Sequence, residues 1–288
     1  MVRAECRAFD ARLEQAIWID GSIRSGGTTM LRSLLWRMSK AGRGPRKLAS
    51  LTPDQLEAVF NSEAIAQEWQ AWAPKLSEVC QIADGRTGGV NVGDRRALFY
   101  LARAFAPARV LEIGTHVGAS TVHLAAALMA GTRSARLVTV DVEDVNDGLQ
   151  AVWRRAGLAK SPKRMIEDLN GRIEARFVIG DSRHFFAANN ETSDLVFLDG
   201  DHSADTVYEE MVSALALINE NGLIVLHDYF PGGRPLWSDG VVISGPFAAV
   251  EKLRASGAAV KVIPLGSLPW PTKLNSHTTS LAVMAKGH

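Results

Sequence analysis

The chain has 288 residues, of which 32 are Lys or Arg and 31 are Asp or Glu, so its formal net charge is +1. Hydrophobic residues make up 47%, enough for a sizeable core, and the balanced charge excludes a strongly basic nucleic-acid-binding protein. With two cysteines, neither a disulfide framework nor a Cys-based zinc site is expected. Since the sequence has no signal peptide and no apolar run that could span a bilayer, we expect a cytoplasmic protein without nucleic-acid or membrane partners.

Basic charge is concentrated at the N-terminus. Residues 1–47 hold ten basic and four acidic side chains, so this segment can attract the acidic remainder or an anionic ligand, or form a solvated arm. The run 18–30 predicts a strand, a Gly-rich turn and a helix start, with phosphate binding as the alternative, although the Lys of a Walker loop is missing. Residues 41–47 are rich in Gly, Pro and Arg and predict a linker.

Two helices are predicted after this linker. Thr52 can cap the first, and Gln55 can close a capping box with it. The second covers residues 62–83, with an interruption at Pro74. Its apolar stripe of Ile65, Trp69 and Trp72 can serve as core packing, as a subunit contact or as a cover over an active site. We expect residues 1–84 to form a mainly helical extension.

Residues 85–288 alternate helices with apolar strands. Helices are predicted at 93–105, 119–129, 149–156, 204–218 and 246–255, and strands at 109–113, 137–142, 177–180, 194–198, 222–226, 260–264 and 280–284. Continuously apolar strands separated by helices indicate a parallel sheet that is covered on both faces. Because no helix separates the last two strands, we expect them to pair antiparallel. The fold class is therefore α/β, a Rossmann-like, doubly wound, mostly parallel seven-stranded sheet with an antiparallel last strand and a helical N-terminal extension.

Glycines, carboxylates and imidazoles follow each of the first five strands. They occur in the runs Glu112-Ile-Gly114-Thr-His-Val-Gly118, Asp141, Gly180-Asp181-Ser182, Asp199-Gly-Asp201-His202 and His227-Asp228-Tyr229. The glycines permit a tight turn before a helix N-terminus, and Asp141 can accept hydrogen bonds from a ribose diol. Since ligands of such sheets bind at the carboxyl ends of the strands, these residues predict the functional site.

Several of these runs resemble a known family. Val90-Asn-Val-Gly-Asp94 and Val110-Leu-Glu-Ile-Gly-Thr-His-Val-Gly-Ala-Ser120 are similar to class I S-adenosylmethionine-dependent methyltransferases, in particular the catechol-type, cation-dependent O-methyltransferases. Phe197-Leu-Asp-Gly-Asp-His202 and Leu226-His-Asp-Tyr-Phe230 are similar to a bacterial branch that includes sugar O-methyltransferases of macrolide pathways. The resemblance covers residue 90 to the C-terminus, so we expect residues 85–288 to form an S-adenosylmethionine-binding domain.

The resemblance implies a role for each matching position. Gly114 and Gly118, with Glu112 behind them, would hold the methionine part of the cofactor, Asp141 would bind the ribose, and Asp181 with Ser182 would lie beside the adenine. The full implied cofactor set is Val92, Glu112, Gly114, Thr115, His116, Gly118, Ser120, Asp141, Asp181, Ser182 and Asp199. The carboxylates of Asp199 and Asp228 would bind a metal ion, and His202 would be the general base.

This chemistry is reasonable for methyl transfer to oxygen. A neutral hydroxyl is a poor nucleophile, and a divalent cation held by Asp199 and Asp228 can lower its pKa. An imidazole has a reference pKa near 6.5, so a neutral ring can accept the hydroxyl proton at pH 7. Two positions depart from the family pattern. At position 227 this chain has His where the sugar branch has a carboxylate, and at position 229 it has Tyr where the catechol branch has an Asn ligand. His227 as a ligand would favour Mn²⁺, Fe²⁺ or Zn²⁺ over Mg²⁺, and Asp201 is an alternative third ligand.

We therefore expect an O-methyltransferase that acts on a small-molecule hydroxyl, such as that of a sugar, a catechol or a secondary metabolite, as a homo-oligomer with Mg²⁺ or Mn²⁺. The alternatives are a metal-independent N- or O-methyltransferase and a non-catalytic S-adenosylmethionine-binding protein. A nicotinamide-dependent oxidoreductase is disfavoured because the glycine spacing is G-x-x-x-G. The loop 231–245 with Trp237 is predicted to be a lid or a substrate wall, or a surface connection, and Trp270 is predicted to be a second substrate wall. His116 and His123 are expected to pack or to face solvent rather than to be catalytic, and His184 can cap the helix that follows.

Overall fold

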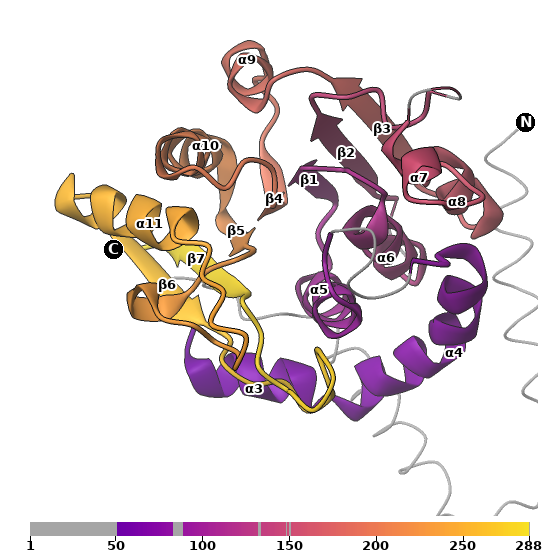
Figure 1. Ribbon diagram of the computed structural model, residues 1–288, viewed down its shortest axis with the longest axis horizontal. Coiled ribbons are helices and arrows are strands. Elements are labelled where there is room, and N and C mark those ends of the chain that lie inside the picture. Colours follow the sequence, from indigo (N-terminus) through magenta and orange to yellow (C-terminus); the bar gives the residue numbers. More distant parts are fainter. Residues whose placement is uncertain (1–50, 83–88, 132–133, 148, 150, 288) are drawn as a thin grey trace, which may run out of the picture. The chain divides into compact units, whose positions relative to one another are not determined.

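The computed structural model describes residues 51–82, 89–131, 134–147, 149 and 151–287. The basic segment 1–47, the Gly-rich run 18–30 and the linker 41–47 lie outside these residues. The helices are α3 (Pro53–Phe60), α4 (Glu63–Val79), α5 (Val92–Phe105), α6 (Ala119–Met129), α7 (Val152–Arg155), α8 (Pro162–Asp168), α9 (Ser182–Ala188), α10 (Ala204–Leu217) and α11 (Gly245–Ala255), with a 3-10 turn η2 (Pro231–Gly233) (Figure 1). The strands are β1 (Arg109–Ile113), β2 (Arg136–Asp141), β3 (Glu174–Ile179), β4 (Ser193–Leu198), β5 (Ile218–Leu226), β6 (Val260–Pro264) and β7 (Ala282–Lys286).

The seven strands form one sheet in the order β3-β2-β1-β4-β5-β7-β6. The pairs from β3 to β5 are parallel, and β7 runs antiparallel to both β5 and β6. The α/β fold class and the antiparallel last strand are thus confirmed. The chain passes from β1 outward to β3 and then returns to β4 on the other side of β1. This reversal places the switch point of the sheet between β1 and β4, where ligands of such folds bind.

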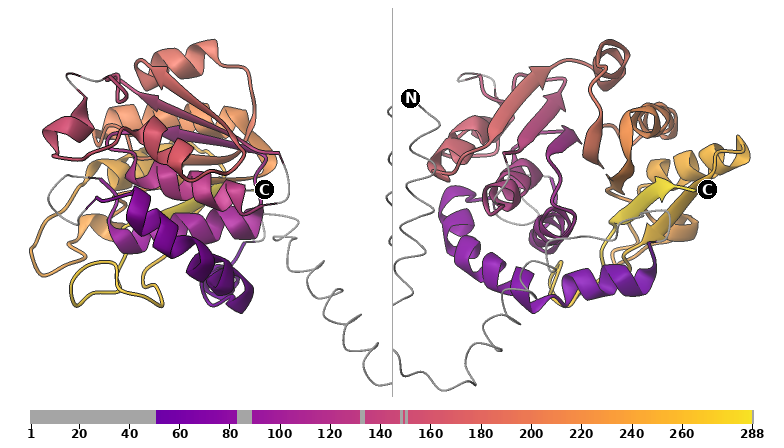
Figure 2. Two further views of the ribbon diagram at one scale, coloured as in Figure 1. Left: turned by 90° about the vertical axis from the view of Figure 1, so that its right-hand side faces the viewer. Right: turned by 180° about the vertical axis from the view of Figure 1, so that it is seen from behind.

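Helices cover both faces of the sheet. In Figure 1 and in the reverse view of Figure 2, α9, α10 and α11 lie on one face, and α5 and α6 lie on the other. Alternation along the strands produces these two cores: Leu195 and Phe197 of β4 face α5, whereas Val196 and Leu198 pack with residues of α10 and α11. Because successive side chains of a strand point to opposite faces, a strand that is buried on both sides has to be apolar throughout.

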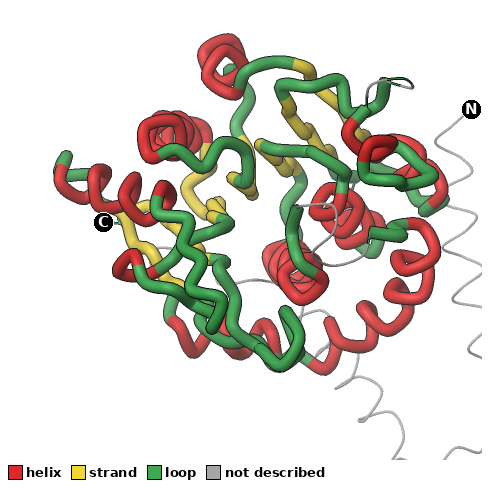
Figure 3. Tube along the Cα trace, in the orientation of Figure 1, coloured by secondary structure: helices red, strands yellow, loops and turns green. Residues whose placement is uncertain are grey.

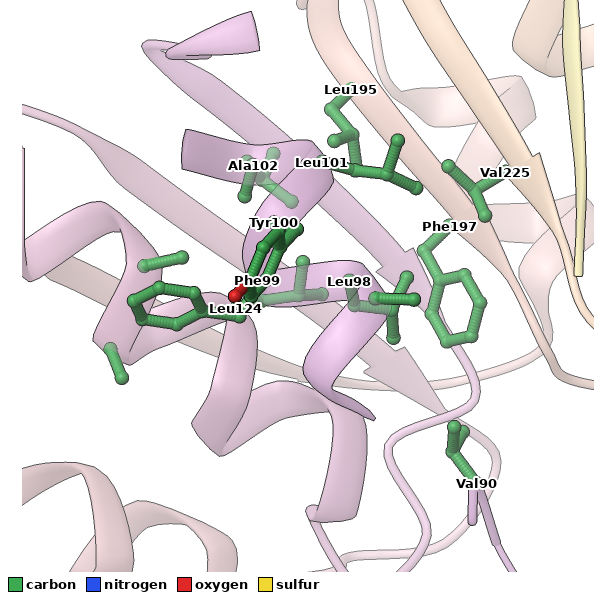
Figure 4. Close-up of a cluster of buried hydrophobic side chains, with 14 of the residues drawn as sticks. Val90, Leu98, Phe99, Tyr100, Leu101, Ala102, Leu124, Leu195, Phe197 and Val225 are labelled. Atoms are coloured by element: carbon green, nitrogen blue, oxygen red, sulfur yellow. The ribbon is translucent and has the colours of Figure 1, made fainter. Parts of the chain in front are cut away.

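The core on the α5 side is packed from long apolar side chains. Leu98 and Leu101 of α5 lie against Leu195, Phe197 and Val225 of the sheet (Figure 4). All five are almost fully buried, and burial of each such side chain stabilises the fold by roughly 1.5–3 kcal/mol. This layer fixes α5 against the sheet, and with it the N-terminus of α5, which reaches the strand ends.

The two helices before α5 pack on this core. The capping box of α3 forms as predicted, since the Thr52 hydroxyl accepts from the Gln55 amide and the Gln55 side chain accepts from the Thr52 amide. The apolar stripe of α4 is core packing: Trp69 contacts the ring of Phe99 edge-on and stacks on His123. The sequence left core packing, a subunit contact and a cover over an active site open for this stripe, and the structure supports core packing.

The predicted interruption at Pro74 is wrong, because α4 continues through it to Val79. Proline removes the amide that would bond to the carbonyl of Gln70, and both residues are exposed, so water can satisfy that carbonyl. Two helices were not predicted, α8 and α9. Each begins at a side-chain cap, Ser161 for α8 and Asp181 for α9.

No helix among the described residues is both long and apolar enough to cross a lipid bilayer.

Candidate active site

A cavity of about 610 Å³ opens at the carboxyl ends of strands β1 to β5. Its size falls within the range of small-molecule sites. The residues that line it are Gly89, Ile113, Gly114, His116, Val140, Asp141, Val142, Glu143, Val152, Gly180, Asp181, Ser182, Arg183, Asp199, Gly200, Asp201, His202, Thr206, Glu210, His227 and Asp228. Residues from five strand ends therefore meet in one space at the switch point of the sheet.

The loop after β1 needs glycine for steric reasons. Gly114 has φ +94°, and a Cβ atom there would lie 2.1 Å from the carbonyl oxygen of Asp199. Gly118 has φ +83°, and its Cβ would lie 2.7 Å from a carbon of Pro162 at the start of α8. Gly114 thus allows β1 and β4 to approach at the cavity, whereas Gly118 allows α8 to pack against the loop.

Glu112 lies behind this loop, fully buried on the α5 side of the sheet. Its Oε2 accepts hydrogen bonds from the hydroxyls of Thr121 (2.6 Å) and Thr139 (2.7 Å). Burial raises the pKa of Glu112 to about 7, although these hydroxyls partly offset the effect. Glu112 does not line the cavity, so its contacts are with the residues that support the loop.

Asp141 ends β2 and is oriented by two backbone amides. Its Oδ2 accepts from the amide of His116 (2.8 Å) and its Oδ1 from the amide of Glu143 (2.9 Å). His116 itself has φ +47°, a left-handed conformation that is uncommon outside glycine. These bonds tie the loop after β1 to the end of β2 and hold the Asp141 carboxylate at the cavity wall.

The end of β3 contributes a cap and a hydroxyl. Asp181 accepts from the Arg183 amide and forms an ion pair with the Arg183 guanidinium (2.9 Å), which holds the pKa of Asp181 well below its usual range. The hydroxyl of the next residue, Ser182, donates to Oε1 of Glu210 on α10 (2.6 Å). This bond joins α9 to α10 at the floor of the cavity.

Glu210 is the second buried glutamate of the site. It is 1% exposed, and within the described part of the chain its Oε2 has no hydrogen-bond partner. Burial raises the pKa of Glu210 to about 7, the Ser182 hydroxyl lowers it, and the carboxylates of Asp201 and Asp181 raise it further. The free oxygen therefore belongs to a side chain that lines the cavity and is not fully satisfied by protein groups.

Asp199, His202 and Asp228 come together at the β4 and β5 ends. One ligand atom of each lies within 4.8 Å of the others. His202 Nε2 is 3.7 Å from Oδ2 of Asp228, whose Oδ1 accepts a hydrogen bond from Ser280 (3.2 Å). Two carboxylates and an imidazole are a donor set that suits Mn²⁺ or Fe²⁺, and Mg²⁺ less well.

His227 lies beneath this group and is buried. Its Nδ1 is 2.8 Å from Oδ1 of Asp199 and 3.5 Å from Oδ2 of Asp228, and its Nε2 is 3.6 Å from Oδ2 of Asp94 on α5. Burial opposes the charged ring, but the neighbouring carboxylates outweigh it and hold the pKa of His227 well above its ordinary value. The ring thus holds Asp199 by a hydrogen bond, outside the group of three that could hold an ion.

The backbone of His202 is fixed by a close contact with α11. A Cβ atom at Gly245, the first residue of α11, would lie 1.7 Å from the His202 carbonyl oxygen. Only glycine permits this approach, and the side chain of His202 remains 44% exposed toward the cavity. Helix α11 therefore positions the loop that carries His202.

Nine residues of the predicted site line the cavity, namely Gly114, His116, Asp141, Asp181, Ser182, Asp199, His202, His227 and Asp228. The other five do not: Glu112 of β1, Thr115 and Gly118 of the loop and Ser120 of α6 are buried, and Val92 is exposed at the start of α5. His123 is buried in the core, and His184 is exposed on α9, whose cap is Asp181.

Neither predicted tryptophan wall lines the cavity. Trp270 is buried, and its indole donates to the carbonyl of Gly93 (2.9 Å), so it anchors α5. Trp237 packs edge-on against Phe230, and the Lys273 ammonium lies 3.4 Å from the centre of its ring. The loops before α11 and between β6 and β7 thus contact each other (green in Figure 3).

The sequence reasoning missed Glu210, although a signal was present. Position 210 lies on the same helical face as Val207, Met211 and Ala214, which are all buried. An acidic residue on an apolar face is costly unless it is paired or bound by a ligand. Arg183, Thr206 and Glu143 also line the cavity and were not predicted.

The described lining holds seven carboxylates and one guanidinium. The carboxylates are Asp141, Glu143, Asp181, Asp199, Asp201, Glu210 and Asp228, and the guanidinium of Arg183 is paired with Asp181. Like charges that face one cavity concentrate a potential of one sign within it. The cavity therefore favours a ligand that carries positive charge.

Residues 111–229 match a protein family described as a methyltransferase domain. No curated protein sequence matches the chain significantly. Among solved structures, the fold is similar to an O-methyltransferase from Bacillus cereus in complex with S-adenosylhomocysteine, with 20% identity, 79% of this chain and 100% of that chain covered, and a TM-score of 0.53. It also matches the O-methyltransferase TomG from Streptomyces achromogenes, which is involved in tomaymycin synthesis, with 21% identity, 79% and 91% coverage and a TM-score of 0.49.

Proposed function

We propose that the chain is a class I S-adenosylmethionine-dependent methyltransferase that transfers the methyl group to a hydroxyl oxygen of a small molecule, as the methyltransferase-domain match over residues 111–229 supports. The observation that carries this proposal is the single cavity at the strand ends, which holds Gly114 and Asp141 together with Asp199, His202 and Asp228. A cofactor site and a set of groups that can activate a hydroxyl thus share one space.

The acidic lining supports the cofactor assignment. S-adenosylmethionine carries a sulfonium and an ammonium group, both of which an acid-rich cavity attracts. The fixed Asp141 carboxylate provides an acceptor for a ribose diol. The Bacillus cereus neighbour, which shares the fold, is described in complex with S-adenosylhomocysteine.

His202 is our candidate for the general base. Its imidazole is exposed to the cavity, and the neighbouring Asp228 lies 3.7 Å away, close enough to stabilise the ring once it takes up a proton. His202 would accept the hydroxyl proton as the oxygen displaces S-adenosylhomocysteine from the methyl group. The loop after β1 and the fixed carboxylate of Asp141 would hold the donor and so supply the orientation that such a displacement needs.

Asp199 and Asp228 would hold a divalent cation through their carboxylates, which lie beside His202 at the β4 and β5 ends. When bound, such an ion lowers the pKa of a coordinated hydroxyl and holds two neighbouring substrate oxygens. His227 keeps Asp199 in place through its 2.8 Å contact. The alternative is a metal-independent methyltransferase with the same cofactor cavity, in which a histidine alone activates the acceptor.

Calorimetric titration with S-adenosylhomocysteine, in the presence of Mn²⁺ or of EDTA, tests the proposal. We expect micromolar binding in both conditions and a separate heat for Mn²⁺. Absence of S-adenosylhomocysteine binding in both conditions would overturn the cofactor assignment. Binding of S-adenosylhomocysteine without any heat from Mn²⁺ would exclude the metal site and support the metal-independent alternative.

The remaining expectations are part of the same proposal. Residues 1–84 would act as a helical extension that serves as a lid or contacts a second subunit, and residues 85–288 would form the methyltransferase domain of a cytoplasmic homo-oligomer. Light scattering of the full chain and of a chain that begins at residue 48 measures whether the N-terminal segment affects the oligomeric state. An unchanged mass per particle would remove this role from the segment.

A further inference from the structure

Glu210 combines three properties that a purely structural residue rarely has together. It is 1% exposed, it lines the cavity, and its Oε2 has no partner among the described residues. An unsatisfied buried polar group costs roughly 1–3 kcal/mol, and more when it is charged. A ligand that donates a hydrogen bond to Oε2 would remove this cost.

The position of Glu210 indicates which part of a bound cofactor it meets. The reactive groups His202 and Asp228 lie at the β4 and β5 ends, and Asp141 lies at the end of β2. If the methyl group faces His202 and the ribose contacts Asp141, as the proposed function requires, the base has to extend beyond the ribose. The lining beyond Asp141 comes from Val142, Glu143 and Val152 after β2, from the β3 end and from α10. Among these residues, Ser182 of the β3 end is bonded to the buried Glu210 of α10.

Ser182 fixes which oxygen of Glu210 is available. Its hydroxyl donates to Oε1 at 2.6 Å, and this bond leaves Oε2 as the free acceptor. The buried carboxyl also faces Asp181 and Asp201, which raise its pKa, and Arg183, which lowers it. A neutral donor from a ligand would stabilise this carboxyl without bringing a further charge into the cavity.

We propose that Glu210 is the residue that selects adenine in the cofactor, by accepting a hydrogen bond at Oε2 from the exocyclic 6-amino group. This inference rests on the proposed function and adds a specificity determinant to it. Hypoxanthine carries a carbonyl oxygen in place of that amine. In S-inosylhomocysteine two hydrogen-bond acceptors, this carbonyl and Oε2 of Glu210, would therefore face each other. A site built on a hydrogen bond of this kind discriminates strongly against a ligand that lacks the donor.

The test compares S-adenosylhomocysteine with S-inosylhomocysteine by calorimetric titration of the full chain at pH 8.5, where Glu210, with a pKa of about 7, is ionised. We expect the wild-type protein to prefer the adenosyl compound by at least about tenfold. Glu210→Leu removes the acceptor, so this preference should fall to about one. Glu210→Gln should reverse it, because the amide oxygen keeps the Ser182 bond and the amide NH₂ then faces the cavity as a donor.

The controls separate this inference from the proposed function. Glu220→Gln removes an exposed glutamate of β5 and should leave the preference unchanged. Thermal unfolding shows whether Glu210→Leu is folded. If it is not, the reversed ligand preference of Glu210→Gln still tests the role of Glu210. A wild-type preference that both variants keep would overturn the role of Glu210, whereas failure of the wild-type protein to bind either compound would overturn the proposed function itself.

Discussion

Two buried glutamates, Glu112 and Glu210, differ in what surrounds them although their titration is similar. Burial raises the pKa of each to about 7. Glu112 lies inside the α5 side of the sheet, where the hydroxyls of Thr121 and Thr139 both donate to its Oε2. Glu210 lines the cavity, and one hydroxyl, that of Ser182, donates to it.

A raised pKa alone therefore does not identify a functional residue. A position on the cavity wall is the better criterion, because only a group that lines the cavity can contact a ligand. We therefore expect variants in the closed layer behind the loop to change stability, and variants along the strand ends to change binding or turnover.

Replacement of His202 should have the largest effect. In His202→Ala we expect the methyl-transfer rate to fall at least about 100-fold, since a positioned general base contributes this much or more. The affinity for S-adenosylhomocysteine and the unfolding temperature should hardly change, because the side chain is 44% exposed. Turnover is measured as S-adenosylhomocysteine release with an acceptor that the wild-type protein methylates, and His184→Ala, an exposed histidine on α9, is the control.

The same variant distinguishes a base from a metal ligand. If His202 is a base alone, Mn²⁺ affinity should be unchanged in His202→Ala. A loss of Mn²⁺ affinity would assign the imidazole to the metal group of Asp199 and Asp228 and remove it from the base role. Full retention of turnover would contradict both assignments.

Glu112→Gln should change how stability depends on pH. Because the folded-state pKa of Glu112, about 7, lies above the ordinary value of 4.5, the folded state binds more protons between these two values. Its contribution to stability is fully present below about pH 4.5 and is lost as the pH rises through about 7. The free energy of unfolding of the wild-type protein should therefore fall relative to the variant, by at most about 3 kcal/mol between pH 4.5 and pH 8.

Urea unfolding at several pH values measures this difference. Glu220→Gln, which removes an exposed carboxylate from the same sheet, controls for the loss of a negative charge. A difference between wild type and Glu112→Gln that stays constant with pH would show that the glutamate is not held in the neutral form by burial. Cofactor affinity should change little in Glu112→Gln if the division between the two regions is correct.

Asp141→Asn should weaken binding of S-adenosylhomocysteine by about tenfold, since one hydrogen bond to a charged acceptor is lost. The amide oxygen can still accept from one of the two backbone amides that hold Asp141, so the loop should keep its conformation. Calorimetric titration measures the affinity, and unfolding in urea checks the loop support. An unchanged affinity would remove Asp141 from the ribose site.

Much of the fold could be predicted because it depends on local patterns. The strands at 109–113 and 260–264 and the helix at 119–129 have the predicted bounds, since apolar runs and glycines delimit them. Helices α8 and α9 were missed because both are short, and their caps, Ser161 and Asp181, were not interpreted as helix starts.

The site was predicted where it depends on strand ends and missed where it depends on packing between distant elements. Asp199 and Asp228 follow neighbouring strands, so their proximity could be inferred from the sheet alone. The contact of Gly245 with His202, the bond between Ser182 and Glu210 and the approach of Asp94 to His227 join segments whose relative position no local pattern encodes.

A crystal structure of the full chain with S-adenosylhomocysteine would show where the cofactor product lies. Our account predicts the ligand in the cavity at the strand ends, with its sulfur toward His202 and Asp228, its ribose on Asp141 and its 6-amino group at Oε2 of Glu210. A ligand outside this cavity, or one that lies in it with the adenine toward His202, would contradict the account.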